Sequence, residues 1–202
     1  MGQVWCGQGG QQFPAGEEGF PVTSEDLIRL YGADGVVFLP ECSRSNLDPV
    51  TAEFLSSVGL PNDRVFVSRA GMQGPERDPY ELGHLFDLDD RHCPPESRSW
   101  QVLGYLPAAL VVLDPASGKV YVFQESALDY QLMHRDIESL VYCLTEFRKL
   151  DDAYKEAYPD SPDVEALVDN FQQAVNSVDL TPLSDQESEW NRILDEVLEE
   201  MW

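Results

Sequence analysis

Basic residues are scarce in this chain. Its 202 residues include 13 Lys and Arg against 37 Asp and Glu, which gives a formal net charge of -24 at pH 7. Binding to nucleic acid phosphates or to anionic lipid depends on clusters of Lys and Arg, and the sequence has no such cluster. The scarcity therefore argues against a nucleic acid or membrane partner and favours a positively charged protein.

Long apolar runs are also absent. No stretch approaches the roughly 18 consecutive apolar residues of a membrane span. Residues 1–21 contain no Lys or Arg and lack the apolar segment of a secretory signal. We therefore expect a cytoplasmic protein. With 43% hydrophobic and 10% aromatic residues, the chain is suited to burying a sizeable core, which argues against intrinsic disorder.

Cysteines are few and widely spaced. Cys6, Cys42, Cys93 and Cys143 show no C-x-x-C pattern, and zinc or redox sites need such close pairs. We expect isolated, reduced thiols, with Cys143 as a small core residue on the apolar side of a helix. The sequence predicts no metal site and no cofactor.

Two motifs that could indicate a ligand have simpler interpretations. Gly7-Gln8-Gly9-Gly10 lacks the third glycine of a dinucleotide loop and is not flanked by a convincing strand or helix. Asp87, Asp89 and Asp90 resemble the start of a calcium loop, but the sixth and twelfth positions are not the Gly and Glu that such a loop needs. We interpret the glycine motif as part of a mobile tail and the three aspartates as a solvated acidic loop.

Catalytic signatures are missing as well. The chain contains no G-x-S-x-G elbow, P-loop or H-E-x-x-H helix. The three histidines are His84, His92 and His134. His92 adjoins Cys93, but adjacent residues rarely converge on one substrate, and no third group is spaced to orient that base. The sequence therefore predicts a protein that is not an enzyme.

The clearest pattern that is present predicts an antiparallel sheet. Residues 100–105, 109–113 and 120–123 are three apolar, β-rich runs, and residues 114–118 supply a turn between the last two. Consecutive strands joined by short turns form a meander. The fold class that we predict is α+β, with a central antiparallel sheet flanked by helices.

The segments before this meander give weaker signals. Short strands are expected at residues 36–39 and 65–67. Residues 68–99 are polar and rich in Pro, Gly and charge, so we expect long loops there, with a short strand near Leu85-Phe86.

Helical spacing and capping signals predict five helices around the sheet. Their expected starts are Thr23-Ser24-Glu25-Asp26, Asp48-Pro49, Asp136, Asp160-Ser161-Pro162 and the capping box Ser184-Asp185-Gln186-Glu187. Gly32 and Gly59 are expected to end the first two, and the third is expected to end near Leu150. The last helix should carry one apolar stripe, formed by Trp190, Ile193, Leu194, Val197, Leu198 and Met201.

We divide the chain into a flexible Gly/Gln-rich tail at residues 1–21, an α+β domain at residues 22–158 and an acidic helical C-terminal extension at residues 159–202 that packs on it. From Asp151 onward, the sequence contains fifteen acidic residues and only two basic ones. A helix dipole disfavours anions in a last helical turn, so acids placed there favour contact with a basic partner. The candidate contact residues are Asp87, Asp89 and Asp90 in the loop region, and Asp195, Glu196, Glu199 and Glu200 at the end of the last helix.

Four short motifs follow one another in a recognisable order. They are the helix end Val58-Gly59-Leu60-Pro61, the dipeptide Leu103-Gly104 within a predicted strand, the turn from Asp114 to Gly118-Lys119-Val120, and the helix opening Asp136-Ile137-Glu138-Ser139-Leu140. In this order and spacing, over about residues 24–150, they resemble the SUKH superfamily of bacterial immunity proteins, in particular its fourth subfamily.

The resemblance implies a central antiparallel sheet with flanking helices, and a cytoplasmic antitoxin that binds and blocks a cognate polymorphic toxin. Many such toxins are nucleases or deaminases with basic clefts, which agrees with the independent argument from charge. One alternative is a regulatory or interaction module on the same scaffold, and another is a hydrolase with dispersed carboxylates. The identity of the toxin, the binding face and the oligomeric state are left open.

Overall fold

The structure is a computed structural model that describes residues 21–39, 47–69, 81–124, 129–157, 163–199 and 201–202. Apart from Pro21, the tail predicted at residues 1–21 lies outside the described residues, as do Cys6 and Cys42. The glycine motif at residues 7–10 lies outside them too.

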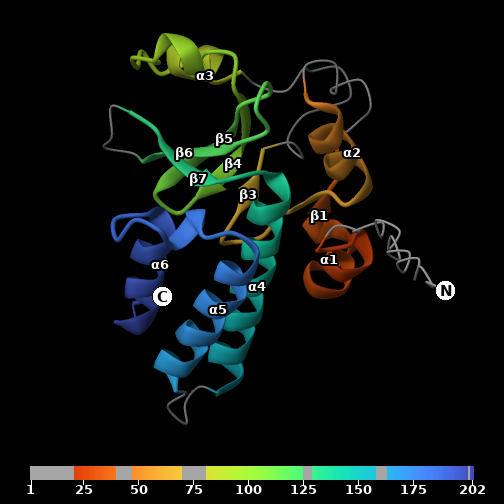
Figure 1. Ribbon diagram of the computed structural model, residues 1–202, viewed down its shortest axis with the longest axis vertical. Coiled ribbons are helices and arrows are strands. Elements are labelled where there is room, and N and C mark those ends of the chain that lie inside the picture. Colours follow the sequence, from red (N-terminus) through yellow and green to blue (C-terminus); the bar gives the residue numbers. More distant parts are fainter. Residues whose placement is uncertain (1–20, 40–46, 70–80, 125–128, 158–162, 200) are drawn as a thin grey trace, which may run out of the picture.

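A five-stranded antiparallel sheet with the order β3-β4-β5-β6-β7 forms the centre of the molecule (Figure 1). Its strands are β3 (Val67–Ser68), β4 (Gln101–Leu106), β5 (Ala109–Leu113), β6 (Val120–Gln124) and β7 (Gln131–His134). The predicted meander is therefore confirmed, and Gly118 closes the β5–β6 turn with a φ of 70°. β7 was not predicted. A separate two-stranded sheet pairs β1 (Val36–Val37) with β2 (Leu60–Pro61).

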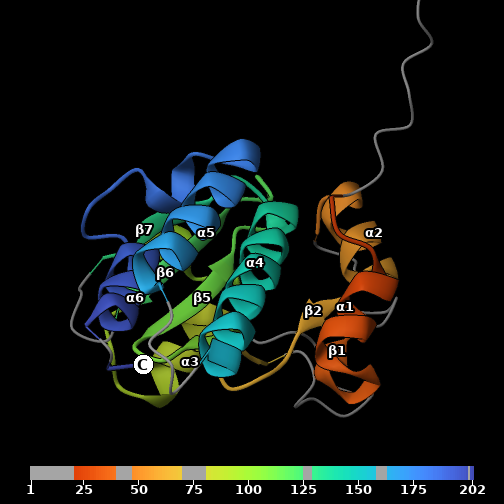
Figure 2. The ribbon, with the colours of Figure 1, turned by 90° about the horizontal axis from the view of Figure 1, so that it is seen from below.

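Helices pack on both sides of the sheet. Their bounds are α1 (Ser24–Tyr31), α2 (Pro49–Ser57), α3 (Leu82–Leu88), α4 (Ile137–Ala157), α5 (Val164–Val178) and α6 (Glu189–Leu198). Short 3-10 turns occur at Ala33–Gly35, Pro95–Ser97 and Thr181–Leu183. α4, α5 and α6 lie on one side of the five-stranded sheet, whereas α1 and α2 lie beside α4 with the small sheet (Figures 1 and 2). The α+β fold class is confirmed.

The starts of the first two helices follow the predicted capping residues. Thr23 and Asp26 form a reciprocal capping box at α1, and Gly32 ends that helix with a φ of 78°. At α2, the carboxylate of Asp48 accepts hydrogen bonds from the backbone N–H groups of Val50 and Thr51. In both cases the side chain satisfies helix N–H groups that have no partner within the helix.

The predicted starts of the last two helices were wrong by a few residues. α5 is capped by Asp163, whose carboxylate accepts from the N–H of Ala166. α6 is capped by Ser188, whereas Ser184 ends the preceding 3-10 turn. Ser184 and Ser188 both offer a capping hydroxyl in this polar stretch, and the structure uses Ser188, which accepts from the N–H of Asn191. Helix α4 also runs seven residues past the end predicted at Leu150, to Ala157.

The prediction of loops and a short strand near Leu85-Phe86 was wrong, because α3 forms there. Leu82 and Phe86 lie one helical turn apart, and both are buried against the sheet. A helix of 7 residues presents too few apolar positions for the helical period to be told from that of a strand.

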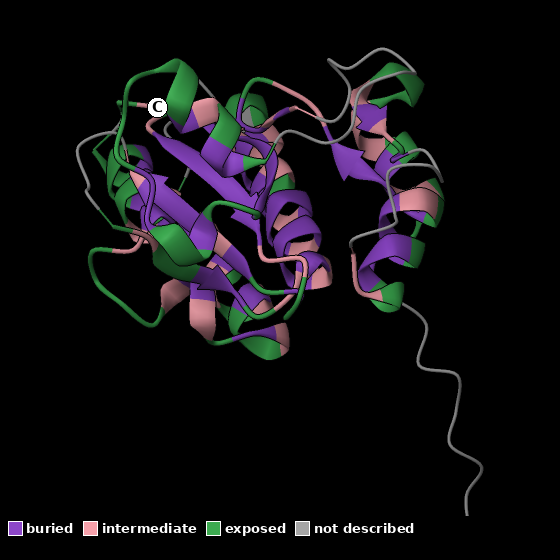
Figure 3. Cartoon of the chain, turned by 90° about the horizontal axis from the view of Figure 1, so that it is seen from above, coloured by how far each residue is buried: buried purple, intermediate pink, exposed green. Residues whose placement is uncertain are grey.

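The sheet separates two hydrophobic clusters. Val111 and Leu113 point into the main cluster, which also contains the buried faces of α1, α2, α4, α5 and α6. Leu110 and Val112 point into a smaller cluster on the opposite face, beneath α3. All residues of β5 are buried, and Figure 3 shows the burial of the sheet between its covering layers. Burial on both faces explains the unbroken apolar run of this strand.

Candidate functional site

The surface formed by α5, α6 and the residues that precede each helix carries a surplus of negative charge. Its exposed acidic side chains are Asp163, Glu165, Asp169, Asp185, Glu187, Asp195, Glu196 and Glu199; we call this surface the α5–α6 face. Arg192 is the single basic residue between positions 163 and 199. Its Nη1 atom lies 3.2 Å from Oε2 of Glu189, a buried acid outside this exposed set. Apart from Arg192, this stretch of the chain therefore supplies no positive charge to balance the exposed acids.

A groove runs between the first half of α5 and the end of α6. It encloses about 680 Å³ and is lined by Asp163, Val164, Glu165, Val168, Asp169, Gln172 and Leu198. Val168 is buried, whereas Leu198 keeps 42% of its surface exposed. The groove thus combines apolar side chains with three carboxylates, all of which come from α5.

The start of α6 is fixed by a chain of buried hydrogen bonds. Nε1 of Trp190 donates to Nε2 of His134 at 2.9 Å, and Nδ1 of His134 lies 2.8 Å from Oγ of Ser139. The Ser139 hydroxyl donates to Oδ2 of Asp179 at 2.7 Å. Since the indole donates to Nε2, the imidazole proton is on Nδ1 and points at Ser139. This series of hydrogen bonds links β7, α4, α6 and Asp179, the residue that follows α5.

The grouping of a histidine with a serine and an aspartate was not expected from the sequence, in which no spacing joins His134 to Ser139 and Asp179. The aspartate contacts the serine rather than the imidazole, which is not the order of a nucleophile, base and orienting acid. All three side chains are buried. Burial lowers the pKa of His134 to about 3, so the ring is neutral near pH 7 and serves to connect elements.

Asp179 carries the charge of this network. Burial works to raise the pKa of its carboxyl, but hydrogen bonds from the Arg135 backbone, the Ser139 hydroxyl and Thr181 outweigh burial and bring the pKa below its ordinary value. A buried carboxylate is tolerated only where such hydrogen bonds replace water. The ionised carboxylate of Asp179 therefore fixes the start of the segment between α5 and α6 to the residues that donate to it.

The chain beyond α6 is anchored to α4 by a second buried acid. Asp151 accepts hydrogen bonds from Arg64, from Lys155 at 2.6 Å and from Nε1 of Trp202 at 3.3 Å. The rings of Trp202 and Phe147 meet edge to face, with centroids 5.2 Å apart. Both ends of α6 are thus tied to the main core, so the α5–α6 face is a rigid surface.

The two groups of candidate contact residues lie far apart. Asp87, Asp89 and Asp90 are at the end of α3, at the opposite end of the molecule from the last turn of α6 (Figure 1). Oδ2 of Asp87 forms an ion pair with Arg98 at 2.6 Å, and Arg91 lies over the ring of Phe86, 4.5 Å from its centroid. Basic residues therefore offset part of the acidity around α3.

The acids at the end of α6 join those of α5. Asp195, Glu196 and Glu199 are exposed, and Glu200 lies outside the described residues. Asp163, Glu165 and Asp169 are not among the contact residues predicted from the sequence, yet the fold places them across the groove from the end of α6. Their i, i+2 and i+6 spacing on a helix gives no signal in sequence, because only the packing of α5 against α6 brings them together.

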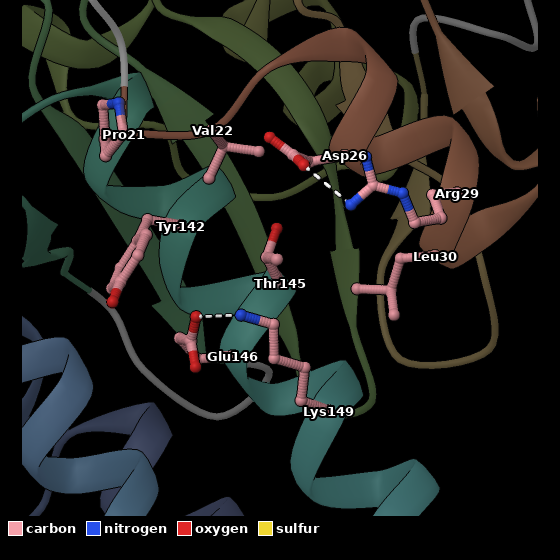
Figure 4. Close-up of a pocket in the computed structure, with 9 residues that line it drawn as sticks. All are labelled: Pro21, Val22, Asp26, Arg29, Leu30, Tyr142, Thr145, Glu146 and Lys149. Atoms are coloured by element: carbon pink, nitrogen blue, oxygen red, sulfur yellow. Dashed lines mark hydrogen bonds and ion pairs between the residues drawn. The ribbon is translucent and has the colours of Figure 1, made fainter.

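A second pocket lies between α1 and α4 and encloses about 280 Å³ (Figure 4). Its charged residues form matched pairs: Arg29 with Asp26 at 3.2 Å, and Lys149 with Glu146 at 2.6 Å. Paired charges leave no net attraction for a ligand of either sign. This pocket therefore differs from the α5–α6 groove in electrostatics as well as in size.

Within the described part of the chain, no cluster of three or more His, Cys, Asp or Glu side chains is arranged to hold a metal ion. No helix formed by these residues is long and apolar enough to cross a membrane. Cys93 and Cys143 are free and buried, and burial raises the pKa of the Cys143 thiol, as expected for a core residue.

The sequence profile of the SUKH-4 immunity protein family matches residues 22–196. The match runs through α5 and most of α6, well past the limit near residue 150 of the resemblance seen in the motifs. No curated protein and no solved structure matches the chain.

Proposed function

The chain belongs to the SUKH-4 immunity protein family, and from this premise we propose that it neutralises a cognate toxin by binding it through the α5–α6 face. The observation that carries the proposal is the presence of eight exposed acids on this face against one basic residue, Arg192. Like charges held close together work against the folded state. A bound partner of opposite charge would offset that cost.

The toxin that fits this surface is a basic one. A nuclease or deaminase presents Lys and Arg to its nucleic acid substrate, and an acidic protein competes for those same side chains. Electrostatic attraction would speed the encounter, and the shape of the interface would set specificity. We therefore propose inhibition by covering a basic cleft in the cytoplasm, with no chemistry performed by the immunity protein.

The rigidity of the α5–α6 face supports this choice of surface. Trp190 is fully buried at the start of α6, and Trp202 holds the chain after its end. A surface that is ordered before binding loses little conformational entropy when the complex forms. The end of α3 has fewer acids, and Arg98 pairs with one of them.

Co-expression with the toxin domain encoded beside its gene tests the proposal. We expect the protein to restore growth of cells that make the toxin, and the two purified proteins to form a complex that weakens as salt is raised. Failure of both protection and complex formation would contradict the proposed function. Stable binding to a protein of the host instead of a toxin would favour a regulatory module on this scaffold.

A further inference from the structure

The apolar stripe of α6 extends beyond the core of the protein. The sequence places six apolar residues on this stripe, and the structure buries the first four, from Trp190 to Val197. Leu198 and Met201 remain 42% and 66% exposed. Leu198 lines the groove against α5, so the stripe leaves the core at the point where the groove begins.

Acidic side chains border the same groove. Asp163 is held at the start of α5, because its carboxylate also accepts the N–H of Ala166 at 3.0 Å. Glu165 and Asp169 are exposed, and among the described residues neither forms an ion pair. The groove between α1 and α4 offers the contrast, since its acids are paired with Arg29 and Lys149.

From this combination we infer that the α5–α6 groove holds a basic segment of the bound toxin, with Lys or Arg side chains laid across Val164 and Leu198. The inference rests on the proposed function and names the part of the toxin that the site takes. Lys and Arg have apolar stems and charged ends. Their stems suit the apolar side chains of the groove, and their charged ends suit the carboxylates of Glu165 and Asp169.

Other occupants match the groove less well. An acidic or phosphate-bearing ligand is repelled by the three carboxylates. A purely apolar segment leaves those carboxylates partly desolvated without partners, which is unfavourable. The groove is open to solvent and has a volume of about 680 Å³, which leaves room for more than one long side chain.

Paired charge reversals test the inference. The groove variant is Glu165→Lys with Asp169→Lys, which leaves the cap residue Asp163 in place. The matched control is Asp34→Lys with Glu53→Lys, which changes the net charge equally at exposed positions in the 3-10 turn Ala33–Gly35 and on α2. Thermal unfolding of both variants checks that each is folded. The toxin domain is the probe, and its association and dissociation rates are measured at several salt concentrations.

We expect the groove variant to weaken toxin binding by at least about tenfold more than the control, because it loses local ion pairs as well as long-range attraction. A second variant, Leu198→Asn, keeps the charge and should mainly raise the dissociation rate. Equal affinities for the groove and control variants, together with an unchanged Leu198→Asn variant, overturn the groove as the site while the proposed function stands. If the wild-type protein binds no toxin, the proposed function itself fails and the groove assignment fails with it.

Discussion

The end of α3 and the α5–α6 face look alike in the sequence, since both contain several acids close together. In the structure they differ. Arg98 pairs with Asp87 at α3 and Arg91 lies beside Phe86, whereas Arg192 is the one basic residue between positions 163 and 199. The comparison shows that a run of acids becomes a charged surface only where folding brings no basic residues to it.

The two regions also differ in how they are attached. α3 packs on the smaller cluster through Leu82 and Phe86. α5 and α6 contribute Val168, Phe171 and Trp190, among others, to the main cluster. The α5–α6 face is therefore part of the main core, and α3 is held by a cluster of its own on the opposite side of the sheet.

The largest expected effect comes from truncating the buried aromatic side chain that packs each region on the core, Trp190 in α6 and Phe86 in α3. Trp190→Ala should lower the free energy of unfolding by about 3–5 kcal/mol, because it leaves a large cavity and removes the hydrogen bond to His134. Phe86→Ala should also lower the free energy of unfolding by leaving a cavity, but this cavity lies beneath α3 and leaves the packing of α6 intact. Denaturant unfolding measures the loss of stability in each variant. Toxin binding, measured at denaturant concentrations where both variants are still folded, then shows which of the two regions the toxin contacts. Loss of toxin binding in the Phe86 variant, with binding kept in the Trp190 variant, would reverse the assignment.

The buried histidine predicts a pH dependence of stability at the α5–α6 side. The pKa of His134 is about 3 in the folded protein and about 6.5 in an unfolded chain, so the unfolded state binds the extra proton between these values. Stability contributed by His134 is complete above pH 6.5 and falls below it, by up to about 1.4 kcal/mol per pH unit. Unfolding in urea at pH 7.5, 6.5 and 5.5 measures this slope.

His134→Gln is the control for this pH dependence, because Gln is uncharged at every pH and can both accept from Trp190 and donate to Ser139. The slope should disappear in this variant. Burial raises the pKa of Glu189, so its contribution is lost as pH rises and has the opposite sign, but it is present in both proteins and cancels in the difference. Identical slopes for the two proteins would contradict the prediction.

A smaller effect is expected when the candidate acids of each region are neutralised in separate variants. Changing Asp195, Glu196 and Glu199 to their amides should slow association with the toxin by about tenfold at low salt. The same change at Asp87, Asp89 and Asp90 should slow association less, because part of that charge is already paired. Stopped-flow association rates at low and high salt compare the two, and a larger loss in the α3 variant would place the contact there.

The smallest effect is expected from breaking the exposed ion pair of α3. Hydrogen bonding to Arg98 lowers the pKa of Asp87, yet both side chains are about half exposed, and solvent screens such pairs. We expect Asp87→Asn to leave the urea midpoint unchanged within error at neutral pH. A clear shift would show that the pair helps to hold α3 on the sheet.

Local sequence signals predicted the elements whose residues lie close together in the chain. The meander, the capping box of Thr23 and Asp26 and the helix start at Asp48-Pro49 depend on neighbouring residues, and the structure confirms them. α3 was missed because four apolar positions in seven residues cannot establish a period. β7 was missed because its strand is short and only half buried.

The groove and the His134 network could not be predicted in this way. Ser139 and Asp179 are 40 positions apart, and His134 and Trp190 are 56 apart, with no spacing rule that joins them. The six-residue stripe of α6 predicted a buried face correctly as far as Val197. The packing of α5 against α6 decides which residues of that stripe are covered. The exposure of Leu198 therefore had no signal in the sequence.

By itself the sequence determined the surplus of acids, the antiparallel meander and the family motifs, because charge, alternation and turn chemistry are properties of short stretches of chain. Only the tertiary structure decided which acids meet arginines and which remain unbalanced, and where the apolar stripe of α6 emerges into a groove. Those outcomes depend on how helices far apart in sequence pack together, and packing is set by the shape of the whole core.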